Sequence, residues 1–233
     1  MRVFVTGATG VLGRPVIERL VAAGISVRAL SRSEVNQSIV KGLGAKPVSA
    51  DLFDAESLAS AIGDSTVILH LATNIPPLSK MRRADAWQVN DRIRERGTAA
   101  LVEAAMATGK VDTFIYPSVC FMYQDGGSNW LTAESADIQA PGMLQSTLTA
   151  ERCVADFALS GKARRGISLR FGAFYGPTSQ DSRDTLKMAS RGLFMPVASA
   201  AAYKSMIWIE DAASAVTAAL ESAETGLYDV VED

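Results

Sequence analysis

The stretch that decides the fold is Arg2-Val3-Phe4-Val5-Thr6-Gly7-Ala8-Thr9-Gly10-Val11-Leu12-Gly13. A short, β-rich apolar run leads directly into three glycines spaced G-x-x-G-x-x-G, and an amphipathic helical pattern follows over 11–23. A strand, a tight turn and a helix N-terminus in this order present backbone N–H groups and a positive dipole end to a phosphate. Glycines also occur in plain strand-to-helix turns. Here the context favours a dinucleotide site, formed by Gly7, Ala8, Thr9, Gly10, Val11, Leu12 and Gly13.

Strand-like and helix-like segments alternate along the rest of the chain. We expect strands at 2–6, 25–30, 46–49, 66–71, 112–117, 166–170, 204–209 and 227–231. We expect helices at 11–23, 35–43, 54–62, 85–109, 144–160, 182–191 and 210–222. Apolar runs such as Thr66-Val67-Ile68-Leu69 are typical of parallel strands that are covered on both faces. The pattern predicts a doubly wound α/β Rossmann fold with a mainly parallel sheet, in a single domain over 1–233, with a small irregular region on the substrate side at 171–207.

The composition is that of a globular protein without a strong charge bias. Of the 233 residues, 48% are hydrophobic and 21% are charged, and the formal net charge is −2. This balance argues against nucleic acid or an anionic membrane as a partner. Cys120 and Cys153 are too few for a disulfide framework, and the sequence shows no metal-ligand cluster. Because no leader pattern or membrane-length apolar run occurs, we expect a cytoplasmic protein.

The end of the second expected strand, Ser31-Arg32-Ser33, bears on the choice of dinucleotide. In this fold an acidic residue near this place binds the ribose 2′-hydroxyl of NAD, whereas an arginine accommodates the 2′-phosphate of NADP. A guanidinium and a hydroxyl both pair well with that phosphate. Ser31 and Arg32 therefore favour NADP(H) over NAD(H). Two alternatives remain open: Glu34 could turn back to the ribose, and Arg32 could be an ordinary solvated side chain.

Further segments show that the chain resembles a known family nearly from end to end. Beside the glycine motif, these segments are Ala50-Asp51-Leu52-Phe53-Asp54, His70-Leu71-Ala72-Thr73, Asn90 with Gly97-Thr98-Ala99, Arg170-Phe171-Gly172-Ala173-Phe174-Tyr175-Gly176-Pro177, and Trp208-Ile209-Glu210-Asp211. Together they resemble the extended and atypical short-chain dehydrogenase/reductases, the NAD-dependent epimerase/dehydratase group. The resemblance implies further cofactor contacts at Asp51, Leu52, Leu71, Ala72, Thr73, Asn90, Phe171 and Phe174.

The catalytic pair that this resemblance implies is absent. Family members use a tyrosine as general acid/base and a lysine that lowers its pKa and holds the nicotinamide ribose, spaced Y-x-x-x-K, with a serine or threonine that polarises the carbonyl. Counting back from Glu151 places Met143 at the tyrosine position and Thr147 at the lysine position. Ser118 lies one residue before the expected serine position. Ser118 and Thr147 are therefore the candidate catalytic residues, although the sequence reveals no charged helper for either.

Two residue types that often carry catalysis have plainer explanations here. The lone histidine, His70, could titrate near neutral pH, or it could be a strand-end residue that is hydrogen-bonded beside the cofactor, as the matching motif implies. Asp54 follows a strand and precedes an expected helix, so a helix N-cap is the simpler interpretation of its carboxylate.

Two functions from different classes fit these observations. The first is an NADP(H)-dependent oxidoreductase or epimerase/dehydratase-like enzyme. Its substrate would be a small, rather apolar organic molecule, because the expected pocket segments are mostly apolar: Ile75-Pro76-Pro77-Leu78, Phe121-Met122, Met143-Leu144 and Phe174. The alternative is a non-catalytic sensor or scaffold that binds NADP(H).

The resemblance also bears on the C-terminus and on assembly. Family members usually continue beyond the segment that matches 226–231, so either the chain is truncated or its substrate cap is reduced to 171–207. The family's usual homodimer would form through the helices expected at 85–109 and 144–160. The alanines of these helices could equally pack against the sheet.

Overall fold

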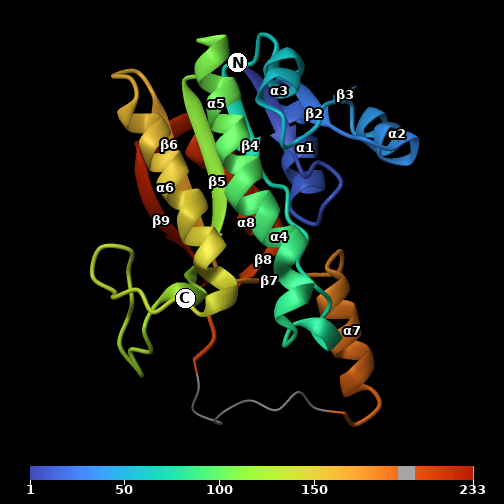
Figure 1. Cartoon of the computed structure of the whole chain (residues 1–233). Coiled ribbons are helices and arrows are strands. Elements are labelled where there is room, and N and C mark those ends of the chain that lie inside the picture. Colours follow the sequence, from blue (N-terminus) through green and yellow to red (C-terminus); the bar gives the residue numbers. More distant parts are fainter. Residues whose placement is uncertain (194–202, 233) are drawn as a thin grey trace.

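A parallel sheet runs through the centre of the computed structural model, which describes residues 1–193 and 203–232 (Figure 1). Its strands are β1 (Arg2–Thr6), β2 (Ser26–Leu30), β3 (Lys46–Val48), β4 (Val67–His70), β5 (Thr113–Val119), β6 (Arg165–Phe171) and β9 (Gly226–Val230). Their order is β3-β2-β1-β4-β5-β6-β9, and all six neighbouring pairs in this sheet are parallel. The order reverses between β1 and β4. At such a point a doubly wound sheet opens a ligand crevice at the carboxyl ends of its strands.

Helices cover both faces of this sheet (Figure 1). The apolar cluster on one face includes residues of α1 (Gly13–Ala22), α2 (Glu34–Gly42) and α8 (Ile209–Ser222), and that on the other includes α3 (Ala55–Ile62), α5 (Thr98–Thr108) and α6 (Gln145–Leu159). β1 contributes to both clusters, with Val3 and Val5 on the first face and Phe4 on the second. Successive side chains of a strand point to opposite faces, so an apolar run is what a strand buried on both sides requires.

The helix expected over 85–109 consists of several consecutive segments. A 3₁₀ turn (Ala84–Trp87) leads into α4 (Gln88–Arg92), a π-helical turn (Ile93–Gly97) and then α5. In the π-helical turn the N–H of Thr98 donates to the carbonyl of Ile93, five residues earlier. Single π turns inside α-helices are frequent at functional sites. Here the turn brings Arg94 to the buried side of the helix.

The region 171–207 holds more regular structure than the sequence indicated. β7 (Ala173–Tyr175) pairs in parallel with β8 (Met206–Trp208), apart from the main sheet, and α7 (Gln180–Ala189) corresponds to the helix expected at 182–191. A Cβ on Gly172 would lie 2.8 Å from the backbone of Met206, so this glycine allows the two segments to approach closely. The sequence missed β7 because a strand of three residues has too few positions for a recognisable period. Residues 194–202 of this region lie outside the described part.

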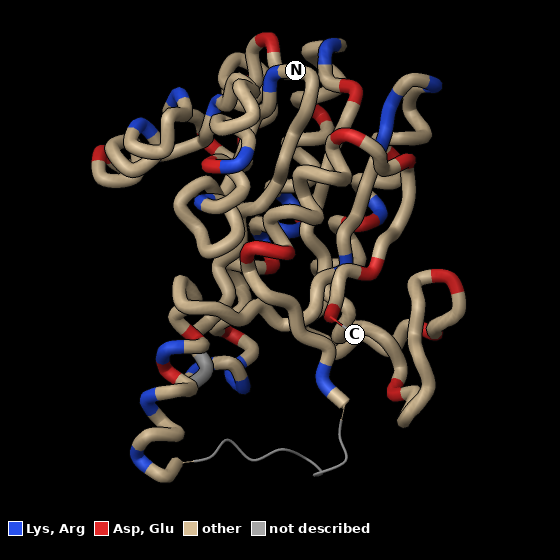
Figure 2. The backbone as a smooth tube through the Cα atoms, turned by 180° about the vertical axis from the view of Figure 1, so that it is seen from behind, with Lys and Arg blue, Asp and Glu red and all other residues tan. Residues whose placement is uncertain are grey.

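The surface carries charges of both signs in an interspersed pattern (Figure 2). This agrees with the net charge of −2. No helix among the described residues combines the length and the apolar character needed to cross a membrane. Within 1–193 and 203–232, no group of three or more His, Cys, Asp or Glu side chains is arranged to hold a metal ion.

Candidate functional site

The turn between β1 and α1 contains three glycines that are required for different reasons. Gly7 has a φ of +74°, and a Cβ there would lie 2.5 Å from the backbone of Leu71 and Ala72. A Cβ on Gly13 would lie 2.2 Å from the carbonyl oxygen of Gly7, so its absence lets α1 pack on the turn. A Cβ on Gly10 would meet only that same oxygen within 4 Å, at 3.2 Å. The protein's own packing therefore requires glycine at Gly7 and Gly13, whereas at Gly10 it opposes an added Cβ through one tight contact only.

The N-terminus of α1 lacks a capping group of its own. Leu12 occupies the N-cap position without a side-chain hydrogen bond, and the first turn contains no acidic residue. The helices α5, α6 and α8 also lack a side-chain cap, whereas α2, α3 and α7 are capped by the side chains of Ser33, Asp54 and Ser179, which confirms the N-cap expected at Asp54. The first N–H groups of a helix need acceptors, and the helix dipole favours an anion there. The residues at this turn therefore fit a bound phosphate group.

Ser31 and Arg32 lie between β2 and α2. Ser31 is 4% exposed, and its hydroxyl has no hydrogen-bond partner among the described residues. Arg32 is exposed, and so is Glu34 at the start of α2. A buried hydroxyl without a partner and an exposed guanidinium thus lie beside a helix N-terminus. Their role toward a 2′-phosphate stays a prediction.

Thr6 connects the carboxyl ends of β1 and β4. Its Oγ1 lies 2.7 Å from Nδ1 of His70 and accepts a hydrogen bond from the N–H of Ala72 at 3.4 Å. His70 is fully buried, and this burial lowers its pKa to about 4, with a smaller contribution from the charge of Arg94. His70 is therefore uncharged at neutral pH, and it is the hydrogen-bonded strand-end residue rather than a group that titrates there.

The other residues expected to contact the cofactor divide equally between accessible and buried positions. The exposed or partly exposed ones are Asp51, Ala72, Thr73 and Phe174, and the buried ones are Leu52, Leu71, Asn90 and Phe171. The side-chain oxygen of Asn90 accepts a hydrogen bond from the N–H of Asn74 at 3.0 Å, which holds the segment after β4 against α4. The rings of Phe171 and Phe174 pack edge to face, 5.3 Å apart. Cofactor contact by these eight residues stays a prediction.

Ser118 belongs to a buried network of hydrogen bonds. Its hydroxyl donates to Oε1 of Glu151 at 2.5 Å, and both carboxylate oxygens of Glu151 accept from Arg170, at 2.8 and 2.7 Å. Arg170 also donates to the hydroxyl of Tyr123 at 3.1 Å, and that hydroxyl donates to Asp229 at 2.5 Å. Burial raises the pKa of Tyr123 above its ordinary value. The network joins β5, α6, β6 and β9. Because the hydroxyl hydrogen of Ser118 is donated to Glu151, it is not free to bind a ligand.

Thr147 lies against a cation that the sequence interpretation missed. The guanidinium of Arg94 donates to Oγ1 of Thr147, and both residues are buried, with exposed fractions of 2% and 0%. Met143, at the implied tyrosine position, is 41% exposed and has no proton to exchange. The signal for Arg94 was its spacing, four residues after Asn90 and four before Thr98, which places all three on one helix face. Because arginine is rarely buried, this spacing alone does not indicate that Arg94 faces inward.

The apolar segments expected around the substrate are partly exposed. Ile75, Phe121 and Met143 have exposed fractions between 41% and 49%, whereas Met122 and Leu144 are buried. The side chain of Leu78 lies outside the described part. Exposed large apolar side chains at the end of the molecule that carries the glycine turn are consistent with a ligand surface, although single exposed side chains are common on proteins.

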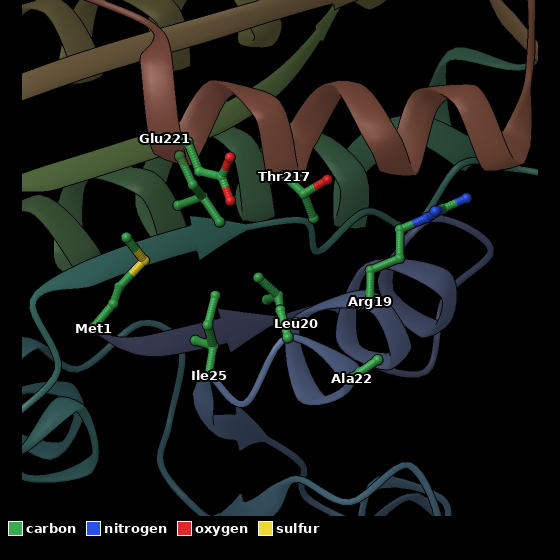
Figure 3. Close-up of a pocket in the computed structure, with 9 residues that line it drawn as sticks. Met1, Arg19, Leu20, Ala22, Ile25, Thr217 and Glu221 are labelled. Atoms are coloured by element: carbon green, nitrogen blue, oxygen red, sulfur yellow. The ribbon is translucent and has the colours of Figure 1, made fainter.

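Two described pockets lie away from the glycine turn. The first, of about 340 Å³, lies between the C-terminal ends of α1 and α8, beside the amino ends of β1 and β2 (Figure 3). Its lining residues are Met1, Arg19, Leu20, Ala22, Ala23, Ile25, Thr217, Leu220 and Glu221. The second lies between α5 and α6. The donors at the glycine turn, rather than the size of a pocket, therefore identify the candidate site.

Comparisons with known proteins show the family to which the chain is similar. The model of the NAD dependent epimerase/dehydratase family matches residues 3–231. A 3-diazoavenalumate denitrifying reductase from a Streptomyces species is 32% identical over all of this chain and 76% of its own length. A ceramide reductase from Caulobacter vibrioides is 25% identical over 98% of this chain and 63% of its own length.

A solved structure extends the likeness to the fold. UDP-glucose 4-epimerase from Thermus thermophilus, in complex with NAD, has a TM-score of 0.77 and 22% identity, covering 99% of this chain and 78% of that one. Its fold is the Rossmann-like fold with a parallel sheet described above. The match over nearly the whole chain and the geometry of the glycine turn lead to one conclusion: this chain belongs to the NAD-dependent epimerase/dehydratase family of short-chain dehydrogenase/reductases.

Proposed function

We propose that the protein is an NADP(H)-dependent oxidoreductase that reduces a small, rather apolar organic molecule. The observation that carries this proposal is the uncapped N-terminus of α1 beside Gly10, the glycine of the turn that protein packing explains least. The turn from Gly7 to Gly13 would hold the pyrophosphate of the dinucleotide. When bound, the dinucleotide would supply the hydride, and the protein would position it.

The two residues that follow β2, Ser31 and Arg32, support the preference for NADP(H). The hydroxyl of Ser31, which has no partner among the described residues, and the exposed guanidinium of Arg32 can both donate to a 2′-phosphate. The N-terminus of α2 adds a dipole of the favourable sign. No acidic side chain occupies the position directly after β2.

Thr147 is the better of the two proposed catalytic hydroxyls. Ser118 already donates its hydrogen to Glu151, whereas Thr147 accepts from Arg94, and its own hydrogen faces the neutral hydroxyl of Tyr116 rather than a carboxylate. A guanidinium bound to the oxygen also makes the O–H group of Thr147 a stronger donor. We therefore assign Thr147 the role of hydrogen-bond donor to the hydride acceptor, and Ser118 a supporting role through Glu151.

The test has a binding stage and a chemical stage. Purified protein is titrated with NADPH and NADH by calorimetry, and single-turnover loss of NADPH absorbance is then followed with a panel of substrates. The panel contains apolar aldehydes and ketones and, because the Streptomyces relative is named for a diazo compound, aryl diazo compounds. We expect NADPH to bind more tightly than NADH and at least one substrate class to consume it. If neither coenzyme binds, the proposal is wrong.

A non-catalytic NADP(H) sensor or scaffold is the second candidate. It is favoured by the apolar Met143 at the tyrosine position and by the engagement of Ser118 within the protein. Both candidates require NADPH to bind, so the binding stage does not separate them. Tight binding without turnover on any substrate class would favour the sensor or scaffold.

We further propose that residues 1–233 form one dinucleotide-binding domain that pairs as a homodimer through α5 and α6. The pocket between these helices is lined by Ala99, Val102, Glu103, Met106, Cys153 and Asp156, and Met106 is 47% exposed. Apolar side chains that are exposed on a helix pair, such as Met106 between the polar Glu103 and Asp156, are a suitable dimer contact. Sedimentation of the wild-type protein and of Met106→Glu would test it, because a carboxylate there should shift a dimer to monomer.

A further inference from the structure

Arg94 carries a positive charge inside the protein without a carboxylate to neutralise it. It is 2% exposed, and none of the ion pairs in the described part of the chain includes it. Its one hydrogen bond there goes to the neutral hydroxyl of Thr147, and its Nε atom is covered and has no partner. A buried charge without an anion is unfavourable for the empty fold. A ligand that supplies acceptors for these N–H groups would remove that penalty.

No described carboxylate forms an ion pair with Arg94, and Asp91 on the same helix accepts a hydrogen bond from the hydroxyl of Ser146 instead. The rings of His70 and Tyr116 lie 6.0 Å apart, and the charge of Arg94 lowers the pKa of both, which places it within electrostatic reach of each. Burial is the larger influence on both groups, lowering the pKa of His70 to about 4 and raising that of Tyr116 to about 12, so both are neutral near pH 7. Glu151, one turn of α6 after Thr147, has both oxygens bound by Arg170.

The location of Arg94 relates it to the proposed dinucleotide. It packs at the end of β4, where His70 is joined through Thr6 to the start of the glycine turn, and against the first turn of α6. In a doubly wound sheet the dinucleotide crosses from one half of the fold to the other at this point. If the pyrophosphate binds at the glycine turn, the nucleoside on the β5 and α6 side is the one that carries nicotinamide. Its ribose presents vicinal hydroxyl oxygens.

We propose that Arg94 binds the ribose hydroxyls of the nicotinamide half of NADP(H). It thereby supplies, from the π-helical turn between α4 and α5, a cation that α6 lacks at Thr147. This inference rests on the proposed function. The fork of N–H groups on a guanidinium matches two neighbouring oxygen acceptors. The several negative charges of the dinucleotide would also offset the unpaired charge of Arg94.

The first test compares Arg94→Met with Arg96→Met. Arg96 belongs to the same π-helical turn and is exposed, so its variant removes the same charge from the solvent side. Each protein is titrated with NADPH and with adenosine 2′,5′-bisphosphate, which lacks the nicotinamide half. We expect Arg94→Met to weaken NADPH binding by about 10- to 100-fold, the range for a lost hydrogen bond to a charged group. Its affinity for adenosine 2′,5′-bisphosphate should not change, and Arg96→Met should affect neither.

A second readout separates ligand binding from a structural role. A structural arginine should destabilise the fold when it is replaced, whereas an unpaired buried cation replaced by methionine should leave the melting temperature of the empty protein unchanged or higher. The double variant Arg94→Met/Thr147→Lys returns a cation to the same place from α6 and should recover most of the NADPH affinity. This recovery would not be expected of a variant that had merely lost packing.

The possible results are distinct. NADPH binding by Arg94→Met that equals wild-type binding overturns this inference and leaves the proposed function intact. Equal weakening of NADPH and adenosine 2′,5′-bisphosphate also overturns it, because the effect would then not be local to the nicotinamide half. Failure of the wild-type protein to bind NADPH overturns both. If Arg94→Met does not fold, Arg94→Lys provides the same comparison with the charge retained and the fork removed.

Discussion

Replacing Gly10 with alanine should weaken dinucleotide binding while the fold survives. Gly10 does not have a positive φ, and its added Cβ would meet only the carbonyl oxygen of Gly7, at 3.2 Å. A shift of a few tenths of an ångström relieves this contact, and alanine reduces the entropy of the unfolded chain. We therefore expect the free energy of unfolding to stay within about 1 kcal/mol of wild type. The methyl group would lie where the pyrophosphate approaches the backbone. Losing one charge-assisted hydrogen bond costs about 1.5–3 kcal/mol, which raises the Kd about 10- to 100-fold.

The matched control is Gly13→Ala in the same turn. Its Cβ would lie 2.2 Å from the oxygen of Gly7 and 2.9 Å from the backbone of Ala8, so α1 must move and the fold should lose about 1–3 kcal/mol. Calorimetric titration with NADPH measures binding, and urea unfolding measures stability. Wild-type NADPH affinity in Gly10→Ala would refute the assignment of this glycine to the ligand. Destabilisation as large as that of Gly13→Ala would show instead that Gly10 serves packing.

Three further outcomes can be measured with the same assays. Arg32→Ala should weaken NADPH by about 10-fold or more and NADH much less, because only NADPH carries the 2′-phosphate; equal weakening of both would refute the preference. Glu151→Gln leaves Arg170 buried without its anion and should cost about 3–5 kcal/mol in urea unfolding, so a near-neutral result would contradict the network. The folded pKa of His70, about 4, lies below its ordinary value of 6.5, so the unfolded chain binds the proton more readily and stability falls as the pH falls through this window. Between about pH 7.5 and pH 5 the loss should be about 2 kcal/mol, and His70→Gln should show a smaller slope.

Local patterns were enough to predict most of the architecture. The continuous apolar runs predicted strands that are buried on both faces, and the structure places Val3 and Val5 on one face of β1 and Phe4 on the other. The glycine turn and the cap at Asp54 were also predictable, because each depends on residues within one turn of the chain. β7 was missed, since its pairing with β8 depends on a close approach at Gly172 to a segment more than thirty residues away.

In the candidate site, too, the features within one short segment were predictable, whereas the contacts between distant segments were not. The sequence alone indicated the glycine turn, the Ser31-Arg32 pair, the absence of the Y-x-x-x-K pattern and the positions of Met143 and Thr147. Only the tertiary structure decided that Arg94 faces inward to Thr147 and that Ser118 is bound to Glu151. A periodic pattern indicates which face of a helix is buried, but not which side chain of another element it meets there. That depends on how two helices and a sheet pack, and packing brings together residues that lie tens of positions apart.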